Sequence, residues 1–170
     1  MLKIILIVVG VVVGIVLLLA VALVVRLSRG PIVFTSKATS ALTVSAVRDQ
    51  SAGSLRCTLR FTGRDKPHSV TEIHMPRELA QALGASPPTG FADEPYVAGP
   101  KVGDEAFVQK FNQGTVRWVG KLALPPDQDV LMSIPARNAR AGSGTIQFRY
   151  EHRGTLGGSI RFCILKLDSE

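Results

Sequence analysis

Apolar and polar residues alternate along the stretch Leu55-Arg56-Cys57-Thr58-Leu59-Arg60-Phe61. Successive side chains of a β-strand point to opposite faces, so this pattern predicts a strand with one face in a hydrophobic core. Similar alternation recurs at residues 116–124, 145–150 and 160–164, and weaker strand patterns occupy residues 32–37, 41–48, 69–74, 105–111 and 130–134. Glycine and proline clusters separate these segments. We therefore predict a mainly β domain, an antiparallel sandwich of about eight strands.

The two cysteines lie in two of these alternating segments. Cys57 falls on the apolar face of its strand, where a thiol behaves as a small hydrophobic group. In the last segment we assign Ile160, Phe162 and Ile164 to the inward face, which points Cys163 the other way. A disulfide needs close Cα atoms and an oxidising compartment, so the pairing of the two thiols stays open.

One short helix is predicted at residues 76–83. Pro76 suits the first helical position, Leu79 and Leu83 share one face, and Gly84 can take the left-handed conformation that ends a helix.

A long loop is predicted to follow the helix, at residues 85–104. It is rich in proline and glycine, and irregular segments of this length inside a small domain are often functional. Its two aromatic residues, Phe91 and Tyr96, are our candidate loop contacts.

The N-terminal segment Ile4–Val25 contains no charged, amide or hydroxyl side chain. As a helix it would span about 33 Å, close to the hydrocarbon thickness of a bilayer. Lys3 flanks one end, and Arg26 and Arg29 flank the other, where their side chains can reach the headgroups. We therefore divide the chain into a transmembrane anchor at residues 1–30 and a β domain at residues 31–170. Cleavage after Ala20-Val21-Ala22 is the alternative, because this spacing suits signal peptidase.

Two features of the anchor bear on partners and orientation. Gly10 and Gly14 are four residues apart on one helix face, which would let a second membrane helix approach closely, from a protein partner or from a second copy. The positive charges after the anchor favour a cytoplasmic domain, whereas a short tail before a long apolar run is typical of a signal anchor that exports the domain. We favour export, which would place the domain outside the cytoplasm at a bacterial inner membrane.

The later strands resemble a known class of domain. Between residues 115 and 150, two apolar strands flank a turn at Pro125-Pro126-Asp127, and Ala141-Gly142-Ser143-Gly144 precedes the next strand. This pattern resembles the late strands of bacterial immunoglobulin-like domains, in which a glycine stands where this chain has Asp127. The resemblance implies an immunoglobulin-like sandwich, and such domains mostly act as spacers, adhesive modules or assembly parts.

The sequence contains no motif for catalysis or metal binding. The three histidines, His68, His74 and His152, have no metal-ligand spacing, and no nucleophile motif or phosphate-binding loop occurs. We therefore predict no catalytic residue, no metal, no cofactor and no small-molecule substrate.

The chain has a net charge of +7, and several of its basic residues lie on the polar faces of the predicted strands. If their strands are neighbours, they form a basic sheet face that could attract anionic lipid or an acidic protein. The candidate residues are Arg56, Arg60, Arg117, Lys121, Arg149 and Arg161. No aromatic residues are interleaved with them for base stacking, so we expect no nucleic acid partner.

These observations favour a non-enzymatic, single-span membrane protein that acts as a binding or assembly subunit of a bacterial envelope complex. The first alternative is a cytoplasm-facing accessory protein whose basic sheet face contacts anionic lipid. The second is an envelope hydrolase or metal carrier.

Overall fold

The computed structural model describes residues 33–35, 41–62, 68–98, 104–154 and 157–168. They belong to one compact unit, Ile32–Glu170. No helix among these residues is long and apolar enough to cross a membrane. The predicted anchor at residues 1–30 lies outside the described residues, and so do Gly10, Gly14, Lys3, Arg26 and Arg29.

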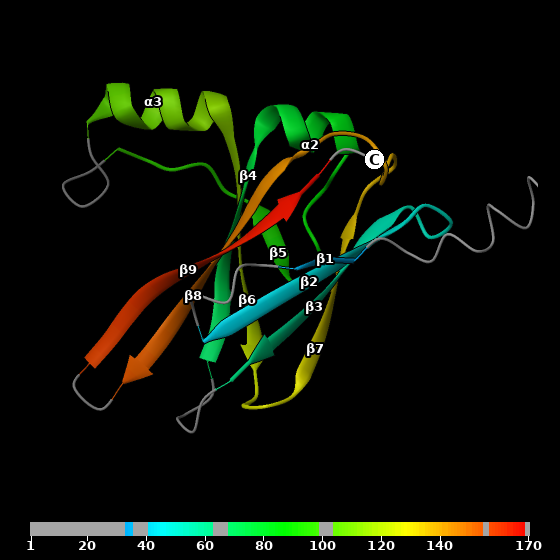
Figure 1. The fold of residues 1–170 in the computed structure, drawn as a ribbon. Helices are drawn as coiled ribbons and strands as arrows, with labels where there is room; N and C mark the ends of the chain where they lie inside the picture. The colour runs from blue at the N-terminus through cyan, green and yellow to red at the C-terminus, as the bar shows by residue number, and fades with distance from the viewer. Residues whose placement is uncertain (1–32, 36–40, 63–67, 99–103, 155–156, 169–170) are drawn as a thin grey trace, which may run out of the picture. The chain divides into compact units, whose positions relative to one another are not determined.

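The fold is mainly β and contains two antiparallel sheets (Figure 1). The four-stranded sheet has the order β1 (Val33–Thr35), β2 (Leu42–Asp49), β3 (Ser54–Phe61) and β7 (Asp129–Pro135). The five-stranded sheet has the order β5 (Phe91–Asp93), β6 (Thr115–Leu124), β4 (His68–Pro76), β8 (Gly144–Gly154) and β9 (Gly157–Leu167). Two helices, α2 (Arg77–Leu83) and α3 (Glu105–Gly114), complete the described elements.

Both sheets contribute to one core, as the alternation of apolar residues predicts. Leu55, Cys57, Leu59 and Phe61 of β3 are all buried, which confirms the inward face assigned to this strand. The five-stranded sheet adds the buried side chains of Ile73, Met75, Trp118, Ile146, Phe148 and Tyr150. Burial of these side chains is the main favourable contribution to folding.

A buried arginine joins three segments at one end of this core. Arg48, at the end of β2, is 9% exposed. Its guanidinium donates hydrogen bonds to the carbonyl oxygens of Arg140, of Gly142 at 2.8 Å and of Asp168 at 2.9 Å. The turn before β8 and the end of β9 are thereby fixed to the four-stranded sheet.

The predicted helix at residues 76–83 is confirmed as α2. The helix begins at Arg77, one residue later than predicted, because Pro76 is the N-cap and not the first helical residue. Gly84 adopts the left-handed conformation with φ of 58°. The amides of Gly84 and Ala85 donate to the carbonyls of Gln81 and Ala80, which closes the last turn.

The strand predicted at residues 105–111 is wrong, because this segment forms α3. Asp104 caps the helix, accepting a hydrogen bond at 2.8 Å from the amide of Phe107. Phe107 and Phe111 are one helical turn apart, so the apolar pattern fits a period of 3.6 as well as a period of 2. The loop predicted at residues 85–104 is interrupted by β5, which pairs with β6.

The inward face assigned to β9 is also wrong. Cys163, Leu165 and Leu167 are buried, whereas Ile160 is 53%, Phe162 48% and Ile164 50% exposed. Cys163 pairs across the sheet with the core residue Phe148, and this register decides which face points inward. Both phases of this strand are apolar, so alternation alone could not choose between them. Cys163 therefore shares the core with Cys57, and both thiols are free.

Gly120 of β6 is required by its close contact with β5. A Cβ at this position would lie 2.3 Å from the carbonyl oxygen of Gly90 and 2.7 Å from Cγ of Phe91. We expect Gly120→Ala to lower the free energy of unfolding by about 1–3 kcal/mol, because β5 must move away. Chemical denaturation of the full chain in detergent, followed by fluorescence of the single, buried Trp118, measures the change.

Gly114→Ala is the matched control, since a Cβ there has no neighbour within 4 Å. It should leave the free energy of unfolding unchanged or raise it by up to about 1 kcal/mol, as alanine favours a helix. Equal losses in the two variants would contradict the crowding of Gly120.

Candidate functional site

The outer face of β4 contains a buried carboxylate. The side chain of Glu72 is 5% exposed, although it lies on the face of the sheet opposite the core. A shift of register between Val70 and Glu72 interrupts the regular ladder at this point. Burying a carboxylate is costly unless it is paired and hydrogen-bonded, so its partners define the site.

Two arginines from the neighbouring strands bind Glu72. Arg117 of β6 donates from Nε to Oε2 at 2.9 Å and from Nη2 to Oε1 at 3.0 Å. This bidentate contact fixes the plane of the carboxylate. Arg149 of β8 donates to Oε1 from Nη1. The carboxylate is thus held between two guanidinium groups, and the three charges sum to +1.

His74 adds a third strand-borne contact to the same carboxylate. Its Nε2 lies 2.8 Å from Oε2 of Glu72, and the side chain is 8% exposed. Burial, and secondarily the positive charge of Arg117, lower the pKa of His74 to about 4. The imidazole is therefore neutral at pH 7. Because an ionised carboxylate only accepts hydrogen bonds, we assign the ring proton to Nε2.

The segment after β5 covers this cluster. The hydroxyl of Tyr96 donates to Oε2 of Glu72 at 3.2 Å, and the guanidinium of Arg117 lies 4.1 Å from the centre of the Tyr96 ring. Asn112 of α3 fixes the backbone of Tyr96 in both directions, accepting from its amide at 3.1 Å and donating to its carbonyl at 2.9 Å.

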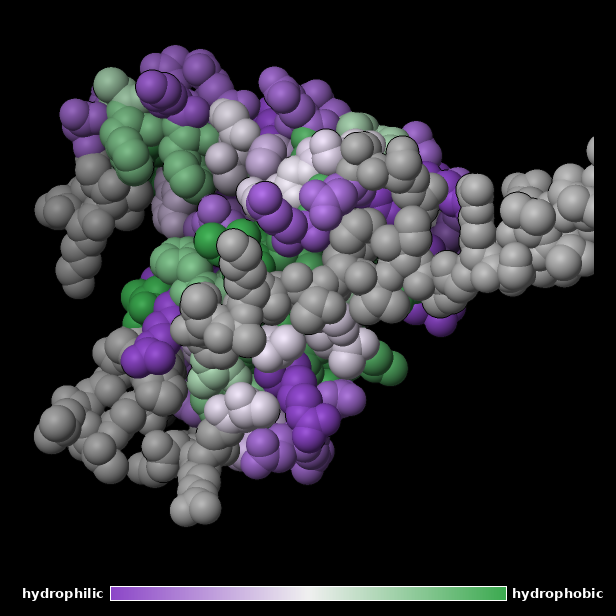
Figure 2. All heavy atoms as spheres, viewed as in Figure 1, coloured by the Kyte–Doolittle hydropathy of each residue, from purple (hydrophilic) through white to green (hydrophobic). Residues whose placement is uncertain are grey.

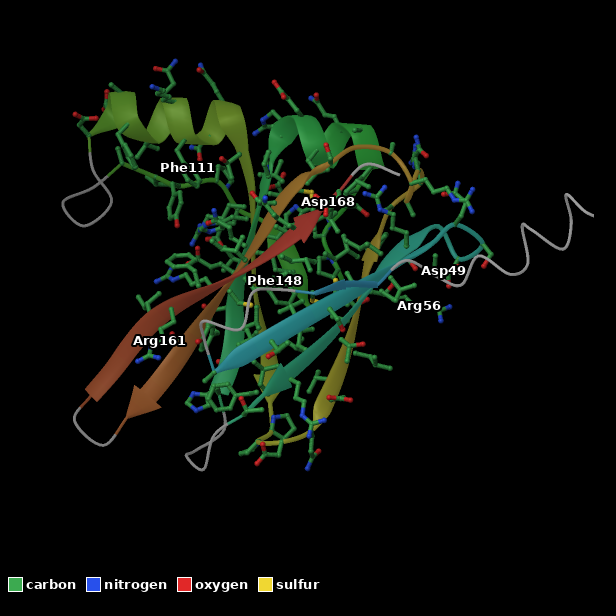
Figure 3. All side chains as sticks on the ribbon, in the orientation of Figure 1. Asp49, Arg56, Phe111, Phe148, Arg161 and Asp168 are labelled. Carbon is green, nitrogen blue, oxygen red and sulfur yellow. The ribbon has the colours of Figure 1, made fainter. Side chains whose placement is uncertain are left out.

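Helix α3 supplies the rest of the cover. Phe111 lies on the side of α3 that faces the sheet (Figure 3), with its ring centre 5.0 Å from Tyr96 and 5.8 Å from His74. Arg77, at the start of α2, donates at 2.9 Å to the carbonyl of Gln113 near the C-terminal end of α3. A cation there also stabilises the helix dipole.

An apolar surface continues from this cluster to the edge of the sheet. The Phe162 ring of β9 lies 6.0 Å from His74, and Figure 2 shows hydrophobic residues over β9 and on α3. We call this region the aromatic surface and define it by its exposed or half-buried residues. They are Tyr96, Phe107, Phe111, Ile160, Phe162 and Ile164.

A small pocket lies within this region, beside His74. Its volume is ≈ 120 Å³, and its lining includes Phe111, Thr145 and Gln147. That volume admits a few water molecules or one side chain of a partner, and it is well below the usual size of small-molecule sites.

The predicted basic face is divided between the sheets. Arg56 and Arg60 are on β3 of the four-stranded sheet, where Arg56 pairs with Asp49 at 2.6 Å and Arg60 with Asp129 at 3.6 Å. Figure 3 places Arg56 beside Asp49 and far from Arg161 of β9.

The other four candidates lie on the five-stranded sheet. Arg117 and Arg149 turn to Glu72, while Lys121 and Arg161 are exposed. Arg161 is opposite the core residue Tyr150 in the register, so it belongs to the other phase of the sheet from Arg149. The six side chains therefore do not form one continuous face.

The two candidate loop contacts also separate. Tyr96 belongs to the cluster around Glu72, whereas Phe91 is half-buried in β5 and packs against the core.

Sequence reasoning missed Glu72 and Phe162. The signal for Glu72 was a charged residue between the apolar residues Val70 and Ile73. These two lie on one face only because the register shifts between Val70 and Glu72, which strict alternation does not predict.

No group of three or more histidine, cysteine, aspartate or glutamate side chains suited to a metal ion occurs in the described part of the chain. Both oxygens of Glu72 are occupied by hydrogen bonds from neighbouring side chains.

Comparison of the chain with protein-family models, with curated proteins and with solved structures found no match. Function must therefore be argued from the geometry of the site.

The lowered pKa of His74 predicts a pH dependence of stability. Its ordinary value is 6.5 and its value in the fold is about 4, so the unfolded chain binds more protons at this residue between those pH values. The contribution of His74 to stability is complete above pH 6.5 and falls as the pH drops toward 4, by at most about 1.4 kcal/mol per pH unit. Denaturation at a series of pH values should show a shallower slope for His74→Gln than for the parent chain. Identical slopes would contradict the assignment.

Proposed function

We propose that this chain is a non-enzymatic, membrane-anchored immunoglobulin-like β-sandwich protein that serves as a binding or assembly subunit of a bacterial envelope complex. The two antiparallel sheets and their common core support the sandwich. Asp127 has φ of 56°, a left-handed conformation, at the turn position where bacterial immunoglobulin-like domains have glycine. This agreement supports the resemblance.

The observation that carries the binding role is the aromatic surface. Three large apolar side chains of β9, Ile160, Phe162 and Ile164, are about half exposed in one row. Contiguous apolar surface of this kind marks interaction sites, and aromatic and arginine side chains contribute most of the binding energy in protein interfaces. Tyr96, Arg117 and Arg149 are bonded to Glu72 beneath this surface, and fixing an interface before it binds lowers the entropy lost on binding.

The membrane part of the proposal rests on residues 1–30. The uninterrupted apolar run Ile4–Val25, with Lys3 before it and Arg26 after it, supports a single span. We place the domain outside the cytoplasm. The lipid-binding alternative has less support, because its six basic residues are shared between two sheets and two of them bind Glu72.

Site-directed photo-crosslinking in the native membrane tests the binding role. A photoreactive phenylalanine analogue at Phe162 should give a discrete adduct, because the side chain lies in the proposed interface. Leu131 is the matched control, being 76% exposed on β7, the terminal strand of the other sheet. Adducts of equal yield at the two positions, or none at Phe162, would refute an interface at the aromatic surface.

Protease protection in spheroplasts tests the orientation. With detection at the C-terminus, we expect digestion of the domain from outside, because a short tail before a long apolar run directs export. Protection until the membrane is lysed would place the domain in the cytoplasm, as the count of flanking charges favours.

A further inference from the structure

Among the described residues, one edge of the terminal strand of the five-stranded sheet has no strand partner. β9 pairs with β8 along all of its length, and it is the last strand in the order of the sheet. In the described part of the chain, no backbone hydrogen bond connects the other edge of β9 to a second segment. A long terminal strand with apolar side chains is a template for another strand, and proteins normally cover or charge such an edge.

The apolar row on this strand has the same order in both directions. Ile160 and Ile164 are each two residues from Phe162, so the row is symmetric about the aromatic residue. If two copies of β9 pair as antiparallel strands about a two-fold axis at Phe162, the two Phe162 side chains face each other. Ile160 of each copy then faces Ile164 of the other, on one face of the sheet.

The charges of β9 are compatible with this register and disfavour the two registers next to it. With the axis at Phe162, Arg161 lies opposite Cys163 and Lys166 lies opposite Gly158, so no like charges meet directly. An axis at Arg161 would place two guanidinium groups opposite each other, which is destabilising. An axis at Cys163 would place Lys166 opposite Ile160 and break the apolar row.

We propose that the occupant of this edge is a second copy of the chain, paired through β9 in the register centred on Phe162. The inference rests on the proposed binding role of the aromatic surface and names the partner. The ring centres of Phe162 and His74 are 6.0 Å apart, so the centre of the proposed interface lies next to the buried cluster around Glu72. Membrane helices paired through Gly10 and Gly14 would raise the local concentration of the second copy.

Disulfide crosslinking of the full chain in its native membrane, under mild oxidation, tests this register. Phe162→Cys should form an intermolecular disulfide, because opposite Cα atoms of an antiparallel pair are about 4.5–5.5 Å apart, within the range of a disulfide. Ile160→Cys and Ile164→Cys should each stay monomeric alone. In the proposed register, each of these cysteines is about 13 Å along the strand from its own copy. When the two variants carry different tags and are expressed together, a mixed disulfide should form.

Two controls accompany these variants. The parent chain reports any reaction of the buried Cys57 and Cys163, and Leu131→Cys reports random collisions at an exposed site of β7. We expect the crosslinked fraction of Phe162→Cys to exceed both by about tenfold or more, since the disulfide geometry is specific.

The outcomes separate the two proposals. Crosslinking of Ile160→Cys alone as efficient as that of Phe162→Cys would overturn the register. No disulfide at Phe162→Cys, together with a photo-adduct from position 162 to a different protein, would overturn the second copy as partner and leave the binding role intact. The absence of both products would overturn both proposals.

Discussion

The rest of the outer face depends on one constraint, the removal of the Glu72 carboxylate from water. Once α3 and the segment with Tyr96 cover it, each of its oxygens must find donors within the protein. Arg117, Arg149, His74 and Tyr96 provide them. Replacing a buried ion pair by apolar residues is often neutral, so the value of the cluster lies less in stability than in orientation. Through Tyr96, which binds both Glu72 and Asn112, the cluster connects the sheet to α3.

This arrangement connects two parts of the chain that sequence reasoning treated separately. The side chain of Asn112 on α3 makes two hydrogen bonds with the backbone of Tyr96. The backbone carbonyl of Arg117 accepts from the amide of Glu94, and the Arg117 guanidinium donates to the Glu94 carbonyl at 3.0 Å. The irregular segment after β5 is therefore bonded to β6 at Glu94 and to α3 at Tyr96. A surface built on such a support presents its aromatic side chains in fixed positions, which suits recognition of one partner geometry.

Most of the fold could be predicted from alternation, and each failure has its own physical cause. β3 has a clear period of 2, so its inward face was correctly assigned. In β9 both phases are apolar, and the register with Phe148, a contact distant in sequence, made the choice. At residues 105–111 the capping by Asp104 and the contacts of Phe111 with the sheet favoured a helix. The charged cluster could not be predicted because its members come from three strands and a loop.

The strand order of the five-stranded sheet has a consequence for how the chain folds. β4 is central, yet its two neighbours, β6 and β8, come much later in the chain. During synthesis, a segment that is apolar on one face and bears Glu72 and His74 on the other must wait for both partners. Folding that depends on such distant pairings is slow. The nascent β4 therefore stays without its neighbours until β6 and β8 have been made, and an unpaired apolar strand is prone to aggregation.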